Sequence, residues 1–193
     1  MNVSEKQYWE KRWQENQTGW DTGARTTPLK EYVDQLTNKG ISILIPGCGN
    51  AYEAEYLVER GFKNVFIVEI SDLAIVSFLK RYPKFPKENI FNLDFFKLDQ
   101  TFDLIIEQTF FCAIDPAMRP AYAFHAAKLL KPKGKLVGLL FNRDFEGGPP
   151  FGGNKDEYLK TFEPNFKIEI MERAYNSIPP RIGTELFIKL VKK

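Results

Sequence analysis

The amino-acid sequence predicts an α/β fold built on a doubly wound, mostly parallel sheet of seven strands. First, five short apolar runs alternate with segments whose apolar residues recur at helical spacing, which is typical of parallel strands joined by helices. Second, a glycine-rich turn directly follows the first apolar run, at residues 46–49. Third, apolar and polar residues alternate in two C-terminal stretches, as they do in an antiparallel hairpin.

Each expected element follows from a local pattern. Residues 1–40 are expected to form a mostly helical segment, in which Pro28 opens a short helix that runs to about Thr37. Residues 41–193 form the main domain, and its first strand (41–45) ends at the glycine turn. Helices are expected over residues 51–60, 71–82 and 116–130, and further strands over 65–68, 90–93, 102–106 and 135–141. A turn is expected at 132–134, an irregular loop at 142–154, and the antiparallel pair at 166–171 and 185–191.

Composition argues against several function classes. Lys and Arg number 27 and Asp and Glu 25, so the net charge of +2 offers no basic excess for nucleic acid. The two cysteines, Cys48 and Cys112, form no CxxC motif, so neither a structural disulfide nor a metal site is expected. No secretory signal and no membrane-length apolar stretch is found in the sequence. We therefore expect a cytoplasmic protein with no nucleic-acid or membrane partner, and, since nothing in the sequence demands an oligomer, a monomer.

The glycine turn indicates a nucleoside cofactor without phosphates. In a doubly wound sheet, ligands bind where the strands end and the strand order reverses, and Gly47 and Gly49 follow the first strand. A dinucleotide fingerprint needs glycine where this chain has Tyr52, and a P-loop motif is absent. The remaining candidates are nucleoside cofactors without phosphates, such as S-adenosyl-L-methionine (AdoMet).

Two carboxylates end the next two strands. Glu69 is placed to accept hydrogen bonds from a ribose diol, although a surface glutamate at a strand end would look the same. Asp94 is placed to accept from an adenine amino group while a neighbouring ring, Phe95 or Phe96, covers the base. The alternative for both phenylalanines is core packing, and one of the two is expected there because adjacent residues rarely share a face.

All three tryptophans of the chain lie near its N-terminus. Trp9 and Trp13 are four residues apart and share one side of a helix, and Trp20 follows a break at Gly19. One interpretation is an amphipathic helix that docks its aromatic stripe on the domain. The other is an aromatic lid over the sulfonium of AdoMet, because an indole face attracts a desolvated cation by about 2 kcal/mol.

Several strings in this order resemble one family. Five parallel strands followed by a hairpin is the chain order of class I, Rossmann-like AdoMet methyltransferases. Between about residues 8 and 190 the chain resembles the small-molecule methyltransferases that include thiopurine S-methyltransferases and plant-type thiol/halide methyltransferases. The matching strings are YWEKRW (8–13), GWDTG (19–23) with PL (28–29), LIPGCG (44–49), FFCAIDP (110–116) with MRP (118–120), GGPPF (147–151) and IPPR (178–181).

This resemblance implies a set of cofactor contacts. The residues that would touch AdoMet are Trp9, Trp13, Trp20, Gly47, Glu69, Asp94, Phe95 and Glu107. The family usually has Asp in place of Glu69, where either carboxylate can serve a diol. Its plant-type members tend to have Asp in place of Glu107. The thiopurine enzymes depart further from this chain around Phe110 to Ile114, so the thiol/halide members are the closer likeness.

The acceptor side is expected to be dry and cationic. Methyl transfer to a thiolate or halide is an in-line displacement that needs alignment and exclusion of water but no strong base. Phe110 and Phe111 would wall a small apolar chamber, unless both are core residues. Arg119 and Arg181 would steer an anion, although a surface salt bridge also fits Arg119. His125 falls on an apolar helical stripe and is expected to be a satisfied core histidine.

The sequence thus predicts an AdoMet-dependent methyltransferase that acts on a small thiol, halide or thiocyanate-like anion, with no certain catalytic residue and no metal ligand. The alternatives are a thiopurine-type or other small-molecule O- or N-methyltransferase, and an AdoMet-binding protein without catalysis. An NAD-dependent oxidoreductase is disfavoured by Tyr52.

Overall fold

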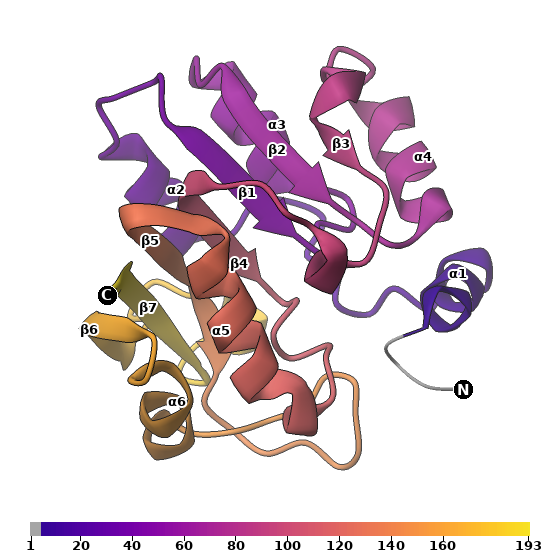
Figure 1. Cartoon of the computed structure of the whole chain (residues 1–193). Coiled ribbons are helices and arrows are strands. Elements are labelled where there is room, and N and C mark those ends of the chain that lie inside the picture. Colours follow the sequence, from indigo (N-terminus) through magenta and orange to yellow (C-terminus); the bar gives the residue numbers. More distant parts are fainter. Residues whose placement is uncertain (1–4) are drawn as a thin grey trace.

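A single mixed sheet forms the centre of the computed structural model, which describes residues 5–193 (Figure 1). The strand order is β3-β2-β1-β4-β5-β7-β6. The parallel strands are β1 (Ser42–Pro46), β2 (Asn64–Val68), β3 (Ile90–Phe91), β4 (Phe102–Gln108) and β5 (Leu130–Phe141). The strands β6 (Phe166–Arg173) and β7 (Glu185–Lys192) pair antiparallel, and β7 also pairs antiparallel with β5. The expected seven-stranded α/β fold is confirmed.

Helices cover both faces of the sheet, as Figure 1 shows. They are α1 (Lys6–Gln14), α2 (Thr27–Asp34), α3 (Tyr52–Glu59), α4 (Asp72–Arg81), α5 (Arg119–Lys128) and α6 (Lys155–Phe162). Four short 3-10 turns lie between them, η1 (Lys87–Asn89), η2 (Phe95–Lys97), η3 (Pro116–Met118) and η4 (Pro179–Arg181). No helix in the described part of the chain is both long and apolar enough to cross a lipid bilayer.

Alternate residues of the strands serve two separate cores, because successive side chains of a strand point to opposite faces. In β1, Ile43 and Ile45 pack with residues of α2, α3 and α4, whereas Leu44 joins the core beneath α5 and α6. All three side chains are almost completely buried. This burial on both faces accounts for the continuous apolar run that marks β1 in the sequence.

The strand order reverses at β1, which lies between β2 and β4. The chain leaves β1 toward α3 on one side and returns through β4 toward α5 on the other, so the carboxyl ends of the two strands leave a crevice between them. Ser71 caps α4, because its side chain accepts a hydrogen bond from the Ala74 amide at 3.1 Å. This cap holds the start of α4 beside the same edge of the sheet.

Three features of the structure differ most from the expectations. The turn expected at 132–134 lies within β5, which already pairs with β4 at Leu130 before the register shifts. Lys133 absorbs the irregularity with a φ of 65°. The helix expected from residue 116 begins with η3 and turns α-helical only at Arg119. The helix α6 was not expected, and Asn154 caps it by accepting from the Glu157 amide at 3.0 Å.

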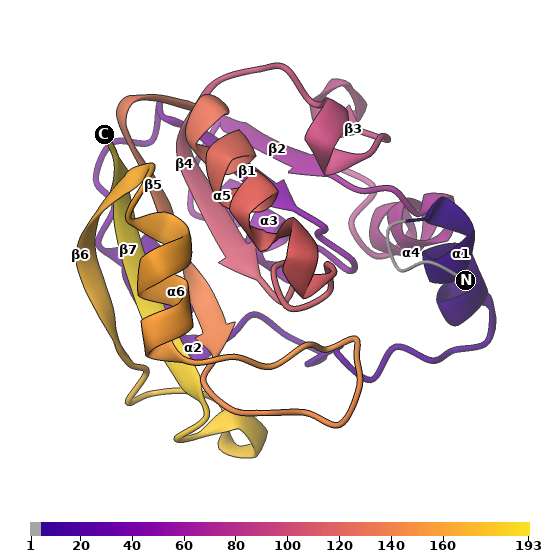
Figure 2. The ribbon, with the colours of Figure 1, turned by 60° about the horizontal axis from the view of Figure 1, so that its bottom comes forward.

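The two helices of residues 5–40 pack in different ways. The helix α2 buries Pro28, Leu29 and Val33 in the core beneath α3. The helix α1 buries no residue and lies beside α4, away from the sheet (Figures 1 and 2). Of these two helices, therefore, only α2 is part of the core, and α1 lies at the edge of the molecule.

Candidate active site

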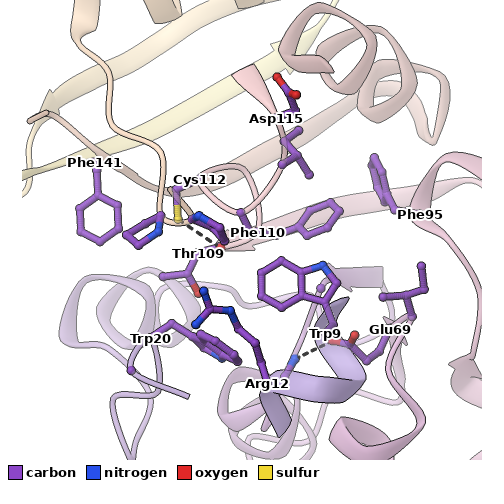
Figure 3. Close-up of a pocket in the computed structure, with 18 of the residues that line it drawn as sticks. Trp9, Arg12, Trp20, Glu69, Phe95, Thr109, Phe110, Cys112, Asp115 and Phe141 are labelled. Carbon is purple, nitrogen blue, oxygen red and sulfur yellow. Dashed lines mark hydrogen bonds between the residues drawn. The ribbon is translucent and has the colours of Figure 1, made fainter. Parts of the chain in front are cut away.

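A cavity of about 700 Å³ opens at the carboxyl ends of the parallel strands. Figure 3 shows Trp9, Arg12 and Trp20 of the N-terminal segment on one side, facing Phe110 and Asp115 from the segment after β4. The loop of residues 142–154 that follows β5 contributes further wall residues. The cavity thus joins chain segments from the beginning, the middle and the end of the sequence.

The turn after β1 needs glycine at the two positions that line this cavity. Gly47 has a φ of 53° and Gly49 a φ of 51°, in the left-handed region that other residues rarely adopt. A Cβ atom on Gly47 would lie 2.2 Å from Cδ2 of Phe110. The ring of Phe110 therefore rests directly on the turn, and the backbone at Gly47 stays accessible from the cavity.

Glu69 is held at the end of β2 by two backbone hydrogen bonds. Its Oε2 accepts from the Gly49 amide at 3.0 Å and its Oε1 from the Ser71 amide at 2.9 Å. Burial raises the pKa of this carboxyl, and the backbone amides oppose that rise. The residue is 7% exposed and lines the cavity, so its remaining lone pairs are available to a ligand.

Asp94 and Phe95 lie where the chain leaves β3. The carboxylate of Asp94 caps η2 by accepting from the Phe96 amide at 3.0 Å, and it lines the cavity. Phe95 is 3% exposed and packs with Phe110 at a ring distance of 5.2 Å. Because Phe95 is both a core residue and a cavity wall, its position is fixed before any ligand arrives.

The three tryptophans form one cluster over the cavity. Trp9 and Trp20 pack edge to face with ring centroids 5.5 Å apart, and Trp13 and Trp20 with centroids 6.2 Å apart. All three rings line the cavity. The structure thus brings together seven of the eight residues that the resemblance assigns to AdoMet: the three tryptophans, Gly47, Glu69, Asp94 and Phe95.

Glu107 is the exception, and the expectation that it touches a cofactor does not agree with its position. Its side chain is fully buried behind the cavity wall. Oε1 accepts from the Phe110 and Phe111 amides, each at 2.8 Å, and Oε2 accepts from the Tyr122 hydroxyl at 2.7 Å. Burial raises the pKa of this carboxyl to about 7. Both oxygens accept hydrogen bonds from groups around the turn after β4. Glu107 therefore holds this part of the cavity wall in position without lining the cavity itself.

Two acceptor-side predictions also need correction. Phe111 is 1% exposed and packs in the core against Tyr158 and Phe162, because the turn after β4 points its ring away from Phe110. Arg119 is buried and does not line the cavity. Its guanidinium pairs with Glu157 at 2.5 Å and donates to the Gly152 carbonyl at 2.7 Å, so it anchors the loop after β5.

The other two residues expected on the acceptor side lie at the cavity, and their role there stays a prediction. Phe110 and Arg181 both line the cavity. Arg181 donates to the Trp20 carbonyl at 3.0 Å and lies 3.4 Å from the Glu185 carboxylate, so it ties the tryptophan cluster to the turn before β7. His125 is satisfied as expected, with Nε2 2.9 Å from the Phe95 carbonyl.

Neither cysteine is an activated nucleophile. Burial raises the pKa of Cys112 to about 12, and its Sγ donates to the Thr109 carbonyl at 3.2 Å. Burial also raises the pKa of Cys48 well above its usual range. Within residues 5–193, no group of three or more His, Cys, Asp and Glu side chains could hold a metal ion.

Sequence reasoning missed two arginines of the wall. Arg12 lies one turn after Trp9 on α1 and lines the cavity, where its Nε donates to the Tyr8 hydroxyl at 2.9 Å. The spacing of three residues from Trp9 is the signal that could have found it. Arg143 stacks over Phe145 at 4.7 Å from the ring centroid, and both lie in the loop after β5. No residue spacing in the sequence predicts that this loop reaches the cavity.

Comparison with known proteins identifies close sequence relatives. "Thiocyanate methyltransferase 1" of Arabidopsis thaliana is 36% identical over 186 residues, which cover 92% of this chain and 81% of the relative. "Probable thiol methyltransferase 2" of the same plant is 35% identical over 185 residues, with the same coverage. The "Thiopurine S-methyltransferase" of Pseudomonas fluorescens (strain SBW25) is 27% identical over 190 residues, which cover 87% of this chain and 86% of that protein.

Solved structures of low sequence identity share the fold. A magnesium protoporphyrin IX methyltransferase from Synechocystis PCC 6803 with bound SAM superposes with a TM-score of 0.76 at 13% identity, covering 100% of this chain and 98% of that chain. A 1,6-didemethyltoxoflavin-N1-methyltransferase from Burkholderia thailandensis with bound S-adenosylhomocysteine gives a TM-score of 0.74 at 16% identity, covering 97% and 87%. The family model described as thiopurine S-methyltransferase matches residues 4–186. The chain therefore belongs to the thiopurine S-methyltransferase family.

Proposed function

We propose that the protein is an AdoMet-dependent methyltransferase that methylates a small thiol, halide or thiocyanate-like anion. The observation that carries this proposal is one cavity in which two strand-end carboxylates, Glu69 and Asp94, face a cluster of three tryptophans. The relatives named as thiol and thiocyanate methyltransferases support the acceptor class.

The residues of the cavity fit this cofactor. The backbone at Gly47 is open to the cavity, and Glu69 is fixed by two amides with lone pairs left for a diol. Asp94, which follows the neighbouring strand β3, offers a hydrogen-bond acceptor for an amino group. When bound, AdoMet supplies a sulfonium-activated methyl group, and the indole faces of the cluster favour such a cation by about 2 kcal/mol.

The acceptor side excludes water and supplies positive charge. Phe110, Phe141 and Phe145 present apolar walls, which weaken the hydration of a soft anion that enters. Arg181 and Arg143 line the same cavity and attract an anionic acceptor. An acceptor that is already anionic needs no general base, which agrees with the hydrogen-bonded His125 and the raised pKa of Cys112.

A larger organic thiol of the thiopurine type is the second candidate acceptor. It is favoured by the aromatic wall of Phe141 and Phe145, whose rings pack edge to face with centroids 5.0 Å apart. An aromatic ring could stack there, whereas a halide would leave this wall without a contact. Both candidates use the same cofactor side and differ only in the size of the acceptor.

The segment around α1 and Trp20 is proposed to act as the lid of this site. Its rings cover the cavity, and Arg181 ties Trp20 to the acceptor side. The proposal is limited to this segment because α2 belongs to the core.

Two measurements test the proposed function. Calorimetry should show binding of S-adenosylhomocysteine, and headspace gas chromatography should detect a methylated product after incubation with AdoMet and iodide, thiocyanate or hydrosulfide. A thiophenol incubation, analysed by liquid chromatography, tests the larger acceptor. Binding without turnover of any acceptor would leave a non-catalytic AdoMet-binding protein, and failure to bind S-adenosylhomocysteine would overturn the cofactor assignment.

A further inference from the structure

The loop after β5 forms one wall of the large cavity, although it contains no helix or strand. Four of its residues line the cavity, namely Arg143, Phe145, Pro149 and Pro150. Gly153 is the only buried residue between positions 142 and 154, so the core does not hold this loop. Contacts outside the cavity therefore decide where the wall residues lie, and a displaced wall would misplace an acceptor.

The two arms of the loop close against each other next to this wall. The Gly153 amide donates to the Arg143 carbonyl at 3.0 Å. At Gly152 a Cβ atom would lie 2.2 Å from the same carbonyl oxygen, so the backbone there is in direct contact with the opposite arm. A contact that fixes Gly152 therefore also fixes Arg143, which lies just after the end of β5.

The guanidinium group of Arg119 holds the second arm of the loop. Its Nη2 donates to the Gly152 carbonyl at 2.7 Å and to the Phe151 carbonyl at 3.3 Å, directly after the prolines of the wall. Its Nη1 pairs with Glu157 of α6 at 2.5 Å. The Phe111 ring lies against the same group, with its centroid 4.9 Å from Cζ. One planar group thus joins α5, α6 and the loop.

Stability alone does not account for the burial of Arg119. The residue is 2% exposed, and its Nε is buried without a hydrogen-bond partner among residues 5–193. Burial of a charged group is costly, and apolar side chains of similar size often replace such groups without loss of stability. The side chain of its partner Glu157 is 41% exposed and stays solvated with or without Arg119. Holding the loop by its carbonyl groups is a role that an apolar side chain cannot fill.

We propose that Arg119 is a positioning residue for the methyl acceptor, because it holds the loop after β5 and thereby keeps Arg143, Phe145 and the two prolines in place around the acceptor. Arg119 acts through the loop, since it does not itself line the cavity. The role rests on the proposed function, because it presupposes an acceptor at this wall. The strand-end carboxylates of the cofactor side follow β2 and β3, at the other end of the parallel strands, so the loop does not hold them.

Kinetics at saturating AdoMet test this role. Arg119→Met removes the donors and keeps an unbranched side chain that adapts to a buried position. The acceptor is the one that the native protein turns over best among iodide, thiocyanate, hydrosulfide and thiophenol, and we expect its KM to rise about tenfold or more. The Kd for S-adenosylhomocysteine, measured by calorimetry, should stay within about twofold of the native value. A residue with a merely structural role would change both values.

Two further variants sharpen the kinetic test. Arg119→Lys keeps the positive charge but lacks the planar fork, so it cannot bind the carboxylate and both carbonyl groups at once. Its KM for the acceptor should lie between those of the native protein and Arg119→Met. Arg60→Met is the matched control, because Arg60 pairs with Asp34 at 3.2 Å and does not line the cavity. It should change neither the KM nor the Kd.

Hydrogen exchange followed by mass spectrometry tests the contact with the loop without turnover. The Phe151 amide donates to the Cys112 carbonyl at 2.7 Å, and the Gly153 amide donates within the loop, so both amides respond to its release. In Arg119→Met, peptides that cover residues 151–153 should exchange about tenfold faster than in the native protein, and peptides from β1 and β4 should not change. If circular dichroism shows that Arg119→Met does not fold, Arg119→Lys replaces it and should raise the acceptor KM by at least about threefold.

The outcomes separate the positioning role from the proposed function. If the native protein turns over none of the four acceptors, the proposed function fails and the positioning role fails with it, whereas hydrogen exchange still shows whether Arg119 holds the loop. If the native protein is active but the Arg119 variants raise the acceptor KM and the S-adenosylhomocysteine Kd by the same factor, Arg119 is a structural residue and the inference is wrong. If neither value changes, or if residues 151–153 exchange at the native rate, other contacts hold the loop and the inference is likewise overturned.

Discussion

The helices α1 and α2 are neighbours in the sequence but are attached to the protein in opposite ways. The helix α2 inserts Leu29 and Val33 into the core, each at most 2% exposed. The helix α1 buries nothing and is attached by polar contacts, such as the one from Lys6 to Asp72 at 2.5 Å. The difference teaches that two helices adjacent in the sequence can have separate roles, because α2 packs in the core and α1 supplies residues to the cavity wall.

The largest effect expected from this comparison is at α2. Leu29→Ala removes a buried side chain and leaves a cavity between α2 and the sheet, so the free energy of unfolding should fall by about 2–5 kcal/mol. Urea unfolding followed by circular dichroism measures it. A loss below 0.5 kcal/mol, roughly the effect of a surface substitution, would place α2 with α1 as a peripheral helix.

The second effect is a pH dependence of stability at Glu107, a buried carboxylate that accepts hydrogen bonds from two backbone amides. Its folded-state pKa of about 7 lies above the unfolded value of 4.5, so the folded state holds the extra proton between these values. Its contribution to stability is present below pH 4.5 and is lost as pH rises to 7 and above, by up to about 3 kcal/mol. Comparison of urea unfolding of the native protein and Glu107→Gln across this range isolates the contribution of Glu107, since Glu69 and the other titratable groups are common to both. Parallel curves would contradict the assignment.

A third effect separates binding from stability at α1. Trp9→Ala should raise the Kd for S-adenosylhomocysteine more than tenfold, because the indole face is lost from the cavity. The free energy of unfolding without ligand should change by less than about 0.5 kcal/mol. Trp9→Phe keeps an aromatic face and should recover part of the affinity. An unchanged Kd with lowered stability would mean that the tryptophans merely dock the helix.

The smallest effect is expected at the polar attachment of α1. Glu10 accepts a hydrogen bond from the Asp72 amide at the start of α4. Glu10→Gln should weaken this attachment by about 0.3–1 kcal/mol, which raises the Kd for S-adenosylhomocysteine by about two- to fivefold. Glu15→Gln, just beyond the end of α1, is the matched control and should have no effect. Equal affinity of both variants would show that α1 is positioned by other contacts.

The most successful sequence predictions were those of cavity residues that directly follow a parallel strand. Glu69, Asp94 and the glycine turn lie at the carboxyl ends of β2, β3 and β1, and the polarity of parallel strands brings these ends together. Glu107 also ends a strand, but its side chain turns inward because the chain after β4 folds back at Thr109, whose φ is 61°. A one-dimensional pattern carries no signal for that reversal.

The remaining errors arise from contacts between distant segments. Arg119 is drawn away from the cavity by Glu157, a residue of the unexpected helix α6. Phe111 is a core residue because Tyr158 and Phe162 of the same helix pack against it. Without α6, nothing in the sequence distinguished Phe111 from Phe110. Missing one helix therefore produced two wrong assignments on the acceptor side.

The tryptophan cluster has a practical consequence. The protein has three tryptophans, and all three line the large cavity. Excitation at wavelengths that tyrosine does not absorb therefore gives an emission signal that originates entirely at the active-site cavity, with no background from the core. Ligand binding and release can be followed in the native protein by its own fluorescence, without a label.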